Sequence, residues 1–234
     1  MRSYAKRGDV MHICWSLILV MGIVMVLPSA GLAAETIKLP PPATKGGMAL
    51  TEALQARRTV RGFATRPLDL AQLSQLLWEA DGMSDPQGHR TSPSAGATYP
   101  IDLYVVVGER GVTNLPAGIY HYDVRAQALS PLVRGDFRAA VARTCLNQAW
   151  MTEAPVLVVI AGEYRRCSAR YGQRGIRYTH TEAGNVSQNL FLAAESLGLG
   201  AGIVGAFEDQ ALAQVLKLPL AHEPLLVMPV GYKN

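Results

Sequence analysis

The sequence lacks several features on which common functional classes depend. Its 234 residues include only three cysteines, too few for a disulfide framework. The formal net charge is +4. Removing residues 1–34 takes away Arg2, Lys6, Arg7 and Asp9 and leaves 19 basic and 17 acidic side chains. This small excess does not indicate nucleic-acid binding. The longest apolar run, residues 15–27, has 13 residues and is too short for a comfortable membrane span.

Motifs for metal-dependent, nucleophilic and nucleotide-dependent catalysis are also missing. There is no H-E-x-x-H, C-x-x-C, G-x-S-x-G, S-x-x-K or Walker A pattern, so the sequence predicts no metal site and no Ser94 nucleophile. A literal G-x-G-x-x-G occurs at residues 200–205. It follows a predicted helix instead of a strand, which argues against dinucleotide binding. These absences favour an organic cofactor that supplies the chemistry itself.

The N-terminus has the organisation of an export signal. Arg2, Lys6 and Arg7 precede the apolar run, and small residues at 28–34 follow it. We expect cleavage after Ala33 or Ala34 and a periplasmic or extracellular mature protein with no membrane span; the alternative is an uncleaved anchor. Cys145 and Cys167 remain in the mature chain, and in an oxidising compartment they could form a disulfide.

The remaining chain predicts one domain over residues 48–234, preceded by a Pro/Gly-rich linker at 35–47. Apolar spacing predicts helices near 48–57, 70–80, 137–146, 181–197 and 209–217. Strands are expected at 102–107, 118–123, 128–132, 155–161 and 225–231. The Arg-rich stretch 162–175 has no clear periodicity. It is predicted to be a long loop and a candidate lid.

Two short stretches could hold an anionic, flat cofactor. The first contains Arg57, Arg58, Thr59 and Arg61; guanidinium groups and a hydroxyl suit phosphate oxygens, although a solvated basic turn is the alternative. The second, residues 93–100, reads P-S-A-G-A-T-Y-P just before a strand. Small side chains there would let the backbone approach a flat ligand, whereas the simpler interpretation is a turn.

Together these segments resemble the FMN-dependent nitroreductase family, in particular its SagB/ThcOx-type dehydrogenase branch. The resemblance rests on R-R-T-V-R-G-F at 57–63, P-S-A-G-A-T-Y-P at 93–100, G-I-Y-H-Y-D at 118–123 and E-A-G-N-V-S-Q-N-L at 182–190. It implies an α+β fold with a mixed, mainly antiparallel sheet flanked by helices. It also implies a homodimer with FMN at the interface.

The resemblance assigns roles to specific residues. Arg57, Thr59 and Arg61, with Arg58 alongside, would hold the FMN phosphate and ribityl chain. Three further segments would surround the flavin ring. Its wall would be formed by Pro93, Ser94, Ala95 and Gly96 of the partner subunit. Asn147 or Gln148 would lie at the pyrimidine edge, and a backbone amide of the segment Val204, Gly205 and Ala206 would face N5. Arg170 and Tyr171 are the candidate catalytic pair.

The expected function is ping-pong hydride transfer through FMN between a small organic substrate and an unknown electron donor. Reduction of a nitro, quinone or enone-like acceptor is favoured over azoline oxidation, because Arg170 stands where the azoline dehydrogenases carry lysine. Unlike lysine, arginine cannot act as a base. The alternatives are a flavin-binding or redox-partner protein without turnover of its own, and an unrelated α/β domain.

Overall fold

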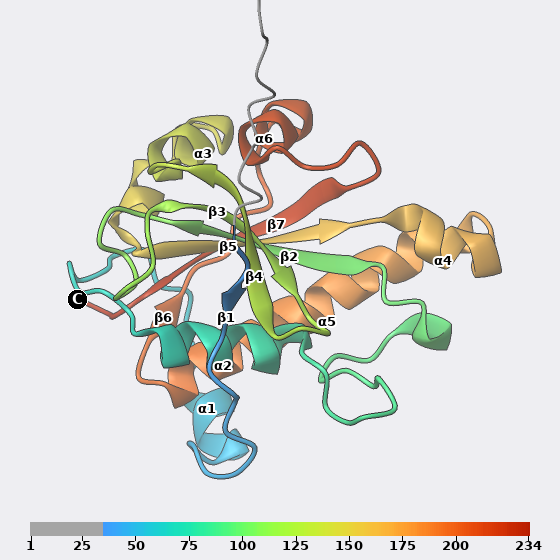
Figure 1. The fold of residues 1–234 in the computed structure, drawn as a ribbon, viewed down its shortest axis with the longest axis horizontal. Coiled ribbons are helices and arrows are strands. Elements are labelled where there is room, and N and C mark those ends of the chain that lie inside the picture. Colours follow the sequence, from blue (N-terminus) through green and yellow to red (C-terminus); the bar gives the residue numbers. More distant parts are fainter. Residues whose placement is uncertain (1–34) are drawn as a thin grey trace, which may run out of the picture. The chain divides into compact units, whose positions relative to one another are not determined.

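The computed structural model describes residues 35–234; the predicted signal peptide, residues 1–34, lies outside the described part. Seven strands form one sheet in the order β1-β4-β3-β2-β5-β7-β6, and all neighbouring strands are antiparallel (Figure 1). They are β1 (Ile37–Lys38), β2 (Ile101–Val107), β3 (Gly118–Asp123), β4 (Ala128–Arg134), β5 (Val156–Gly162), β6 (Gly200–Ala201) and β7 (Glu223–Gly231). The predicted strands are confirmed, and the fold class is α+β.

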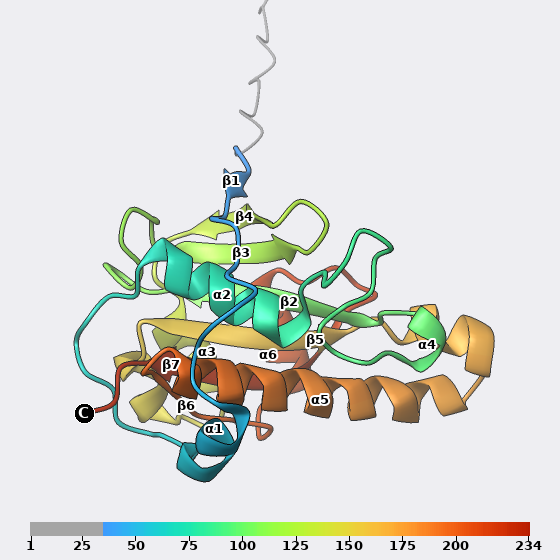
Figure 2. The same cartoon turned by 90° about the horizontal axis from the view of Figure 1, so that it is seen from below.

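Helices cover both faces of the sheet because its central strands are apolar on both sides. On one face, α2 (Leu70–Asp81) and α5 (Arg174–Ser196) pack against Leu103, Val105 and Val107 of β2. On the other, α3 (Arg138–Thr144) and α6 (Asp209–Leu216) pack against Tyr104 and Val106. Figures 1 and 2 show α1 (Leu50–Ala56) on the α2–α5 side. Strict alternation along β2 thus divides the core into two layers.

The N-terminal end of α2 is fixed by a capping side chain. Asp69 caps α2 in a capping box: its side chain accepts a hydrogen bond from the Gln72 N–H at 2.7 Å. The Gln72 side chain in turn accepts one from the Asp69 N–H at 3.0 Å. This reciprocal pairing satisfies two N–H groups that an uncapped helix would leave free.

The expected linker at 35–47 differs from the structure. Ile37–Lys38 pair with β4 as an added edge strand, and Leu39 is buried. The Pro40 carbonyl accepts a hydrogen bond from Ser74 at 2.5 Å. The ordered domain therefore begins before residue 48. The prolines were interpreted as a sign of a linker. Prolines can nevertheless follow an edge strand, because only one side of such a strand is hydrogen-bonded to a neighbour.

The predicted loop at 162–175 is wrong. Residues Tyr164–Tyr171 form helix α4, and α5 starts at Arg174, seven residues earlier than expected. Gly172 ends α4 with a φ of 56°. A Cβ on Gly175 would lie 2.5 Å from the Ser168 nitrogen. The two glycines thus allow a close helix–helix corner; in the sequence they look like loop residues.

Neither remaining cysteine is oxidised in the described part of the chain. Cys145 and Cys167 are both buried and unpaired, so the disulfide considered above is absent from this structure. Burial raises the pKa of the Cys145 thiol to about 11, which keeps it protonated near neutral pH. No helix within residues 35–234 is long and apolar enough to cross a membrane.

Candidate active site

The predicted phosphate segment follows α1 and runs beside β6. The Val60 N–H donates to the Ala201 carbonyl at 2.9 Å, and Thr59 forms a parallel bridge with Ala201. This approach needs glycine next to it: a Cβ on Gly202 would lie 2.7 Å from the Val60 carbonyl oxygen. Tertiary pairing therefore brings residues 57–61 and the 200–206 segment together, although about 140 residues separate them in the sequence.

The arginines of this segment are not equivalent. The Arg58 guanidinium donates to the carbonyls of Gln55 and Arg57 at 2.9 and 2.8 Å. The Arg57 guanidinium lies 5.1 Å from the centre of the Phe191 ring, and that of Arg61 lies 5.8 Å from the Trp150 ring. Within residues 35–234, neither Arg57, Thr59 nor Arg61 uses its side chain in a hydrogen bond. These three are free to bind an anion, while Arg58 closes the end of α1.

Of the two candidate amides, only Gln148 is joined to this group. Its side-chain oxygen accepts a hydrogen bond from the indole N–H of Trp150 at 3.3 Å, and the same indole lies beside Arg61 and Gly202. Asn147 is exposed and has a left-handed backbone, with a φ of 57°.

The segment at 204–206 presents free backbone donors. Val204 is buried and exchanges hydrogen bonds with Val227 of β7, at 2.8 and 2.9 Å. Gly205 and Ala206, which follow it, are exposed, and in the described part of the chain neither N–H has a hydrogen-bond acceptor. A buried anchor followed by two unpaired N–H groups suits a cofactor atom that becomes negatively charged.

The second predicted group, residues 93–96, lies against the end of α4. Gly96 has a φ of 57°, and a Cβ there would lie 2.4 Å from the Tyr171 hydroxyl. The Arg170 guanidinium donates to the Gly96 carbonyl at 3.2 Å. Glycine is thus required both by conformation and by space. The structure brings the candidate catalytic pair, Arg170 and Tyr171, directly onto this loop.

Glu182 of α5 holds the loop and was not among the predicted site residues. It is 5% exposed, and its Oε1 accepts the Ala95 N–H at 2.8 Å. Burial raises the pKa of the Glu182 carboxyl, an effect that hydrogen bonds from Ala95 and Ser94 only partly offset. An acidic residue on the apolar stripe of a predicted helix was the signal available in the sequence.

A partly buried charge network attaches α4 to the sheet. Arg166 pairs with Asp102 of β2 at 2.7 Å and with Glu163 at 2.6 Å, and it donates to the Tyr99 carbonyl at 3.1 Å. Burial alone would raise the pKa of Asp102, but a hydrogen bond from His121 and the charge of Arg166 lower it. Asp102 therefore stays ionised, and the network fixes the helix that carries Arg170 and Tyr171.

The two groups lie on opposite sides of α5. Arg57 packs on Phe191, whereas the 93–96 loop is held by Glu182. Nine residues separate the two anchors, which is about two and a half helical turns. We refer to residues 57–61 as the phosphate segment and to residues 93–96 as the flavin-wall loop, after their predicted roles. Within one chain these two segments consequently do not face the same space.

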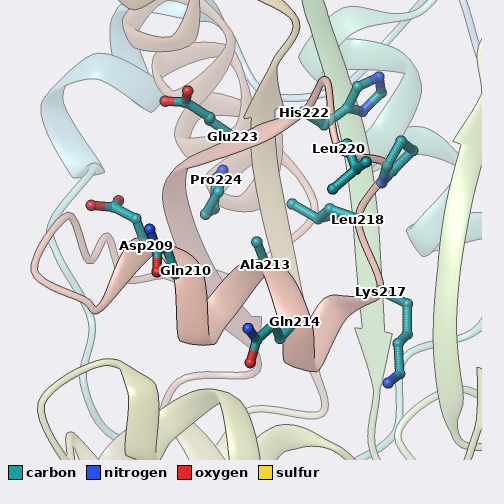
Figure 3. A pocket seen from close by; sticks show the side chains of 11 residues that line it. Asp209, Gln210, Ala213, Gln214, Lys217, Leu218, Leu220, His222, Glu223 and Pro224 are labelled. Atoms are coloured by element: carbon teal, nitrogen blue, oxygen red, sulfur yellow. The ribbon is translucent and has the colours of Figure 1, made fainter.

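A separate hollow of the described surface lies away from both groups. It measures about 870 Å³ and is lined by α6, the loop after it and the start of β7, including Leu220, His222 and Glu223 (Figure 3). None of the sequence-predicted site residues lines it.

Comparison with known proteins identifies relatives of this chain. A protein of Methanocaldococcus jannaschii described as a nitroreductase is 41% identical over 79% of this chain and 91% of its own length. The Escherichia coli microcin B17-processing protein McbC is 27% identical, and the match spans 71% of this chain and 63% of McbC.

Among solved structures, a nitroreductase-type protein of Ralstonia eutropha superposes with a TM-score of 0.73 at 30% identity, over 88% of this chain and 93% of its own. The NADPH:FMN oxidoreductase of Vibrio harveyi shares the fold with a TM-score of 0.58 at 19% identity, over 79% and 69%. The nitroreductase family model matches residues 54–232. Fold, site segments and relatives lead to one conclusion: the chain belongs to the nitroreductase family.

Proposed function

We propose that this protein is an exported, FMN-dependent oxidoreductase that transfers hydride between an organic donor and a small nitro, quinone or enone-like acceptor. The observation that carries the proposal is that the side chains of Arg57, Thr59 and Arg61, which form no hydrogen bond within residues 35–234, lie on the same edge of the sheet as the free N–H groups of Gly205 and Ala206. Export rests on the sequence of residues 1–34 alone.

The residues present fit FMN. Arg57, Thr59 and Arg61 would bind the phosphate and ribityl hydroxyls, and Gln148 the pyrimidine edge. The N–H groups at 205 and 206 would steady negative charge on the ring. When bound, FMN would supply two-electron redox chemistry between a reduced donor, such as a nicotinamide, and an acceptor such as a quinone, which takes up two electrons and two protons to become a hydroquinone. The solved Vibrio harveyi relative is an FMN oxidoreductase by name.

Arg170 acts in this site as a positioning residue. Its guanidinium donates to the Gly96 carbonyl and has no acceptor atom for a proton, so it cannot remove a proton from an azoline. The Tyr171 hydroxyl, which lies against Gly96, can donate a hydrogen bond to a substrate. This arrangement favours acceptor reduction over azoline oxidation.

Turnover is tested with the purified mature chain under anaerobic conditions. We expect a yellow protein whose flavin absorbance bleaches with NADPH or dithionite and recovers on addition of 1,4-benzoquinone. Recovery no faster than that of free FMN at equal concentration would support a flavin-binding protein without turnover. A colourless protein that takes up no FMN would overturn the proposal.

A homodimer would complete the site. Because the two groups of cofactor residues lie on opposite sides of α5, the 93–96 loop of one subunit can only meet the phosphate segment of a second. An apolar patch for such contact is present on α1, where Leu50 and Leu54 are 64% and 51% exposed and Met48 is exposed beside them. Exposed leucines four residues apart form one helical stripe.

Charging this stripe is expected to separate the subunits. In the Leu50→Glu/Leu54→Glu variant, two carboxylates per helix would be buried without partners, which is strongly unfavourable. Light scattering should show a dimer for the wild type and a monomer that retains no flavin for the variant. Leu132→Glu, on the exposed side of β4, is the matched control and should remain a yellow dimer. A dimeric double variant would exclude α1 from the interface.

A further inference from the structure

The corner between α4 and α5 is strongly basic and largely unneutralised. Between residues 164 and 181 there are five arginines and no acidic residue. Arg166 is paired with Asp102 and Glu163. The other four are exposed and form no ion pair within residues 35–234: Arg165, Arg170, Arg174 and Arg177. In Figures 1 and 2 this corner extends past the end of the sheet at the right. Anions should therefore be attracted to this end of the molecule.

Part of this charge borders a hollow beside the flavin-wall loop. The hollow, about 260 Å³, is lined by residues of that loop and of one stripe of α5: Pro93, Ser94, Ala95, Tyr178, Thr181, Glu182 and Asn185. Arg174 precedes Tyr178 by four residues, and Arg177 precedes Thr181 by four. Side chains four residues apart lie one above the other on a helix. Both arginines thus continue the stripe that forms the wall of the hollow.

The loop is also contacted from α4. Arg170 reaches the Gly96 carbonyl at 3.2 Å, and Arg174 begins α5 on the other side of the corner. The Tyr171 and Tyr178 rings pack edge to face, with centroids 5.2 Å apart. An aromatic wall beside guanidinium groups suits a planar, unsaturated molecule that ends in an anionic group.

One acidic group lies in the hollow and could oppose an anion. Glu182, however, is 5% exposed and its Oε1 is engaged by the Ala95 N–H at 2.8 Å. It stands two helical turns beyond Arg174, about 12 Å along the axis. The arginines meet solvent whereas Glu182 does not, so the field that an approaching ligand meets is positive.

We infer that the acceptor taken by this site is an unsaturated organic anion, bound through its carboxylate or phosphate group by Arg174 and Arg177 with its planar body against the loop at 93–96. The inference rests on the proposed function, since the loop matters to substrate only if it borders the flavin. It adds what the flavin residues do not decide: the charge of the substrate.

The test compares acceptors that differ in charge. The FMN-loaded dimer is reduced with dithionite, and its reoxidation is followed by stopped flow with 4-nitrobenzoate, 4-nitrophenyl phosphate or neutral 4-nitrobenzyl alcohol. The nitro group takes two electrons and two protons from the reduced protein and becomes a nitroso group with loss of water. We expect an anionic acceptor to be preferred. In Arg174→Gln/Arg177→Gln the preference should fall roughly tenfold, as expected for the loss of two exposed charge pairs. The carboxylate and phosphate arms show which anion fits better.

Binding without turnover provides the second readout. Calorimetric titration of the oxidised wild-type dimer should detect benzoate more readily than benzyl alcohol, and this difference should shrink in the double variant and in high salt. Arg134→Gln, at an exposed arginine on β4, removes one positive charge elsewhere and should keep the wild-type preference. Equal rates for charged and neutral acceptors, or a preference that survives in the double variant, would overturn the inference. Loss of turnover with every acceptor would instead count against the proposed function, while the benzoate titration still tests the arginines.

Discussion

Replacing both Arg57 and Arg61 with alanine is expected to abolish FMN retention. Each guanidinium would contribute a charge-assisted hydrogen bond to the phosphate, worth about 1.5–3 kcal/mol. Losing both should weaken binding by roughly 10² to 10⁴-fold. The variant should be purified colourless, and titration with FMN, followed by quenching of flavin fluorescence, measures the change. The fold should persist, because both side chains stack on the surface of aromatic rings without hydrogen-bonding to the protein.

Arg58 provides the matched control within the same segment. Its guanidinium is already engaged by two carbonyls at the end of α1, so Arg58→Ala should reduce FMN affinity far less than the double variant does. Far-ultraviolet circular dichroism checks that all three proteins are folded. If the double variant binds FMN as tightly as the wild type, the phosphate lies elsewhere; if Arg58→Ala has the larger effect, the assignment of roles within the segment is wrong.

Glu182→Ala is expected to produce the second large effect, through the shape of the 93–96 loop. The substitution removes the acceptor of the Ala95 N–H, and an unsatisfied buried group costs about 1–3 kcal/mol. Two non-glycine residues just after the loop have positive φ, Ala97 at 53° and Tyr99 at 45°, so this stretch of backbone depends on such restraints. We expect slower reoxidation by acceptor, at least about tenfold, because small displacements in an active site are costly.

Glu182→Gln is the control, because the amide oxygen can still accept the Ala95 N–H. Its turnover should stay near that of the wild type, while pH affects the two proteins differently. Burial raises the pKa of the Glu182 carboxyl above its usual value. The wild type is therefore most stable below about pH 4.5 with respect to this group, and it loses stability as the pH rises through the raised pKa. The glutamine variant lacks this loss, so melting temperatures compared at pH 5 and pH 8 should diverge. An equal pH response, or normal turnover in Glu182→Ala, would remove Glu182 from this role.

Elements with strong local signals were predictable from the sequence. The run V-L-V-V-I-A at 156–161 is apolar at every position, and it forms the central strand β5 between β2 and β7. The helix α2 has both an apolar stripe and a capping residue, Asp69. In these segments the pattern of apolar residues and the residues that bound the element predict the same structure, so tertiary contacts only reinforce what the chain prefers locally.

The sequence was less informative where tertiary contacts decide. Gly172 and Gly175 resemble loop residues, but they permit the corner between α4 and α5. Ile37 and Lys38 become a strand because β4 offers a free edge, which no pattern in residues 35–47 reveals. The strand at 37–38 is stabilised by a segment that is remote in the sequence, and the corner depends on close contact between backbones. Hydrophobic periodicity reveals neither of these.

The sequence by itself determined the family, the sheet and helix framework and the residue types of the candidate site, because each depends on short motifs or local periodicity. The tertiary structure alone decided how those residues are divided. It left Arg57, Thr59 and Arg61 free while engaging Arg58, placed Arg170 and Tyr171 on Gly96, and gave Glu182 its loop. It also placed the phosphate segment and the flavin-wall loop on opposite sides of α5. The sequence cannot show this, because the number of helical turns between two residues of α5 is informative only when the segment that each residue contacts is known.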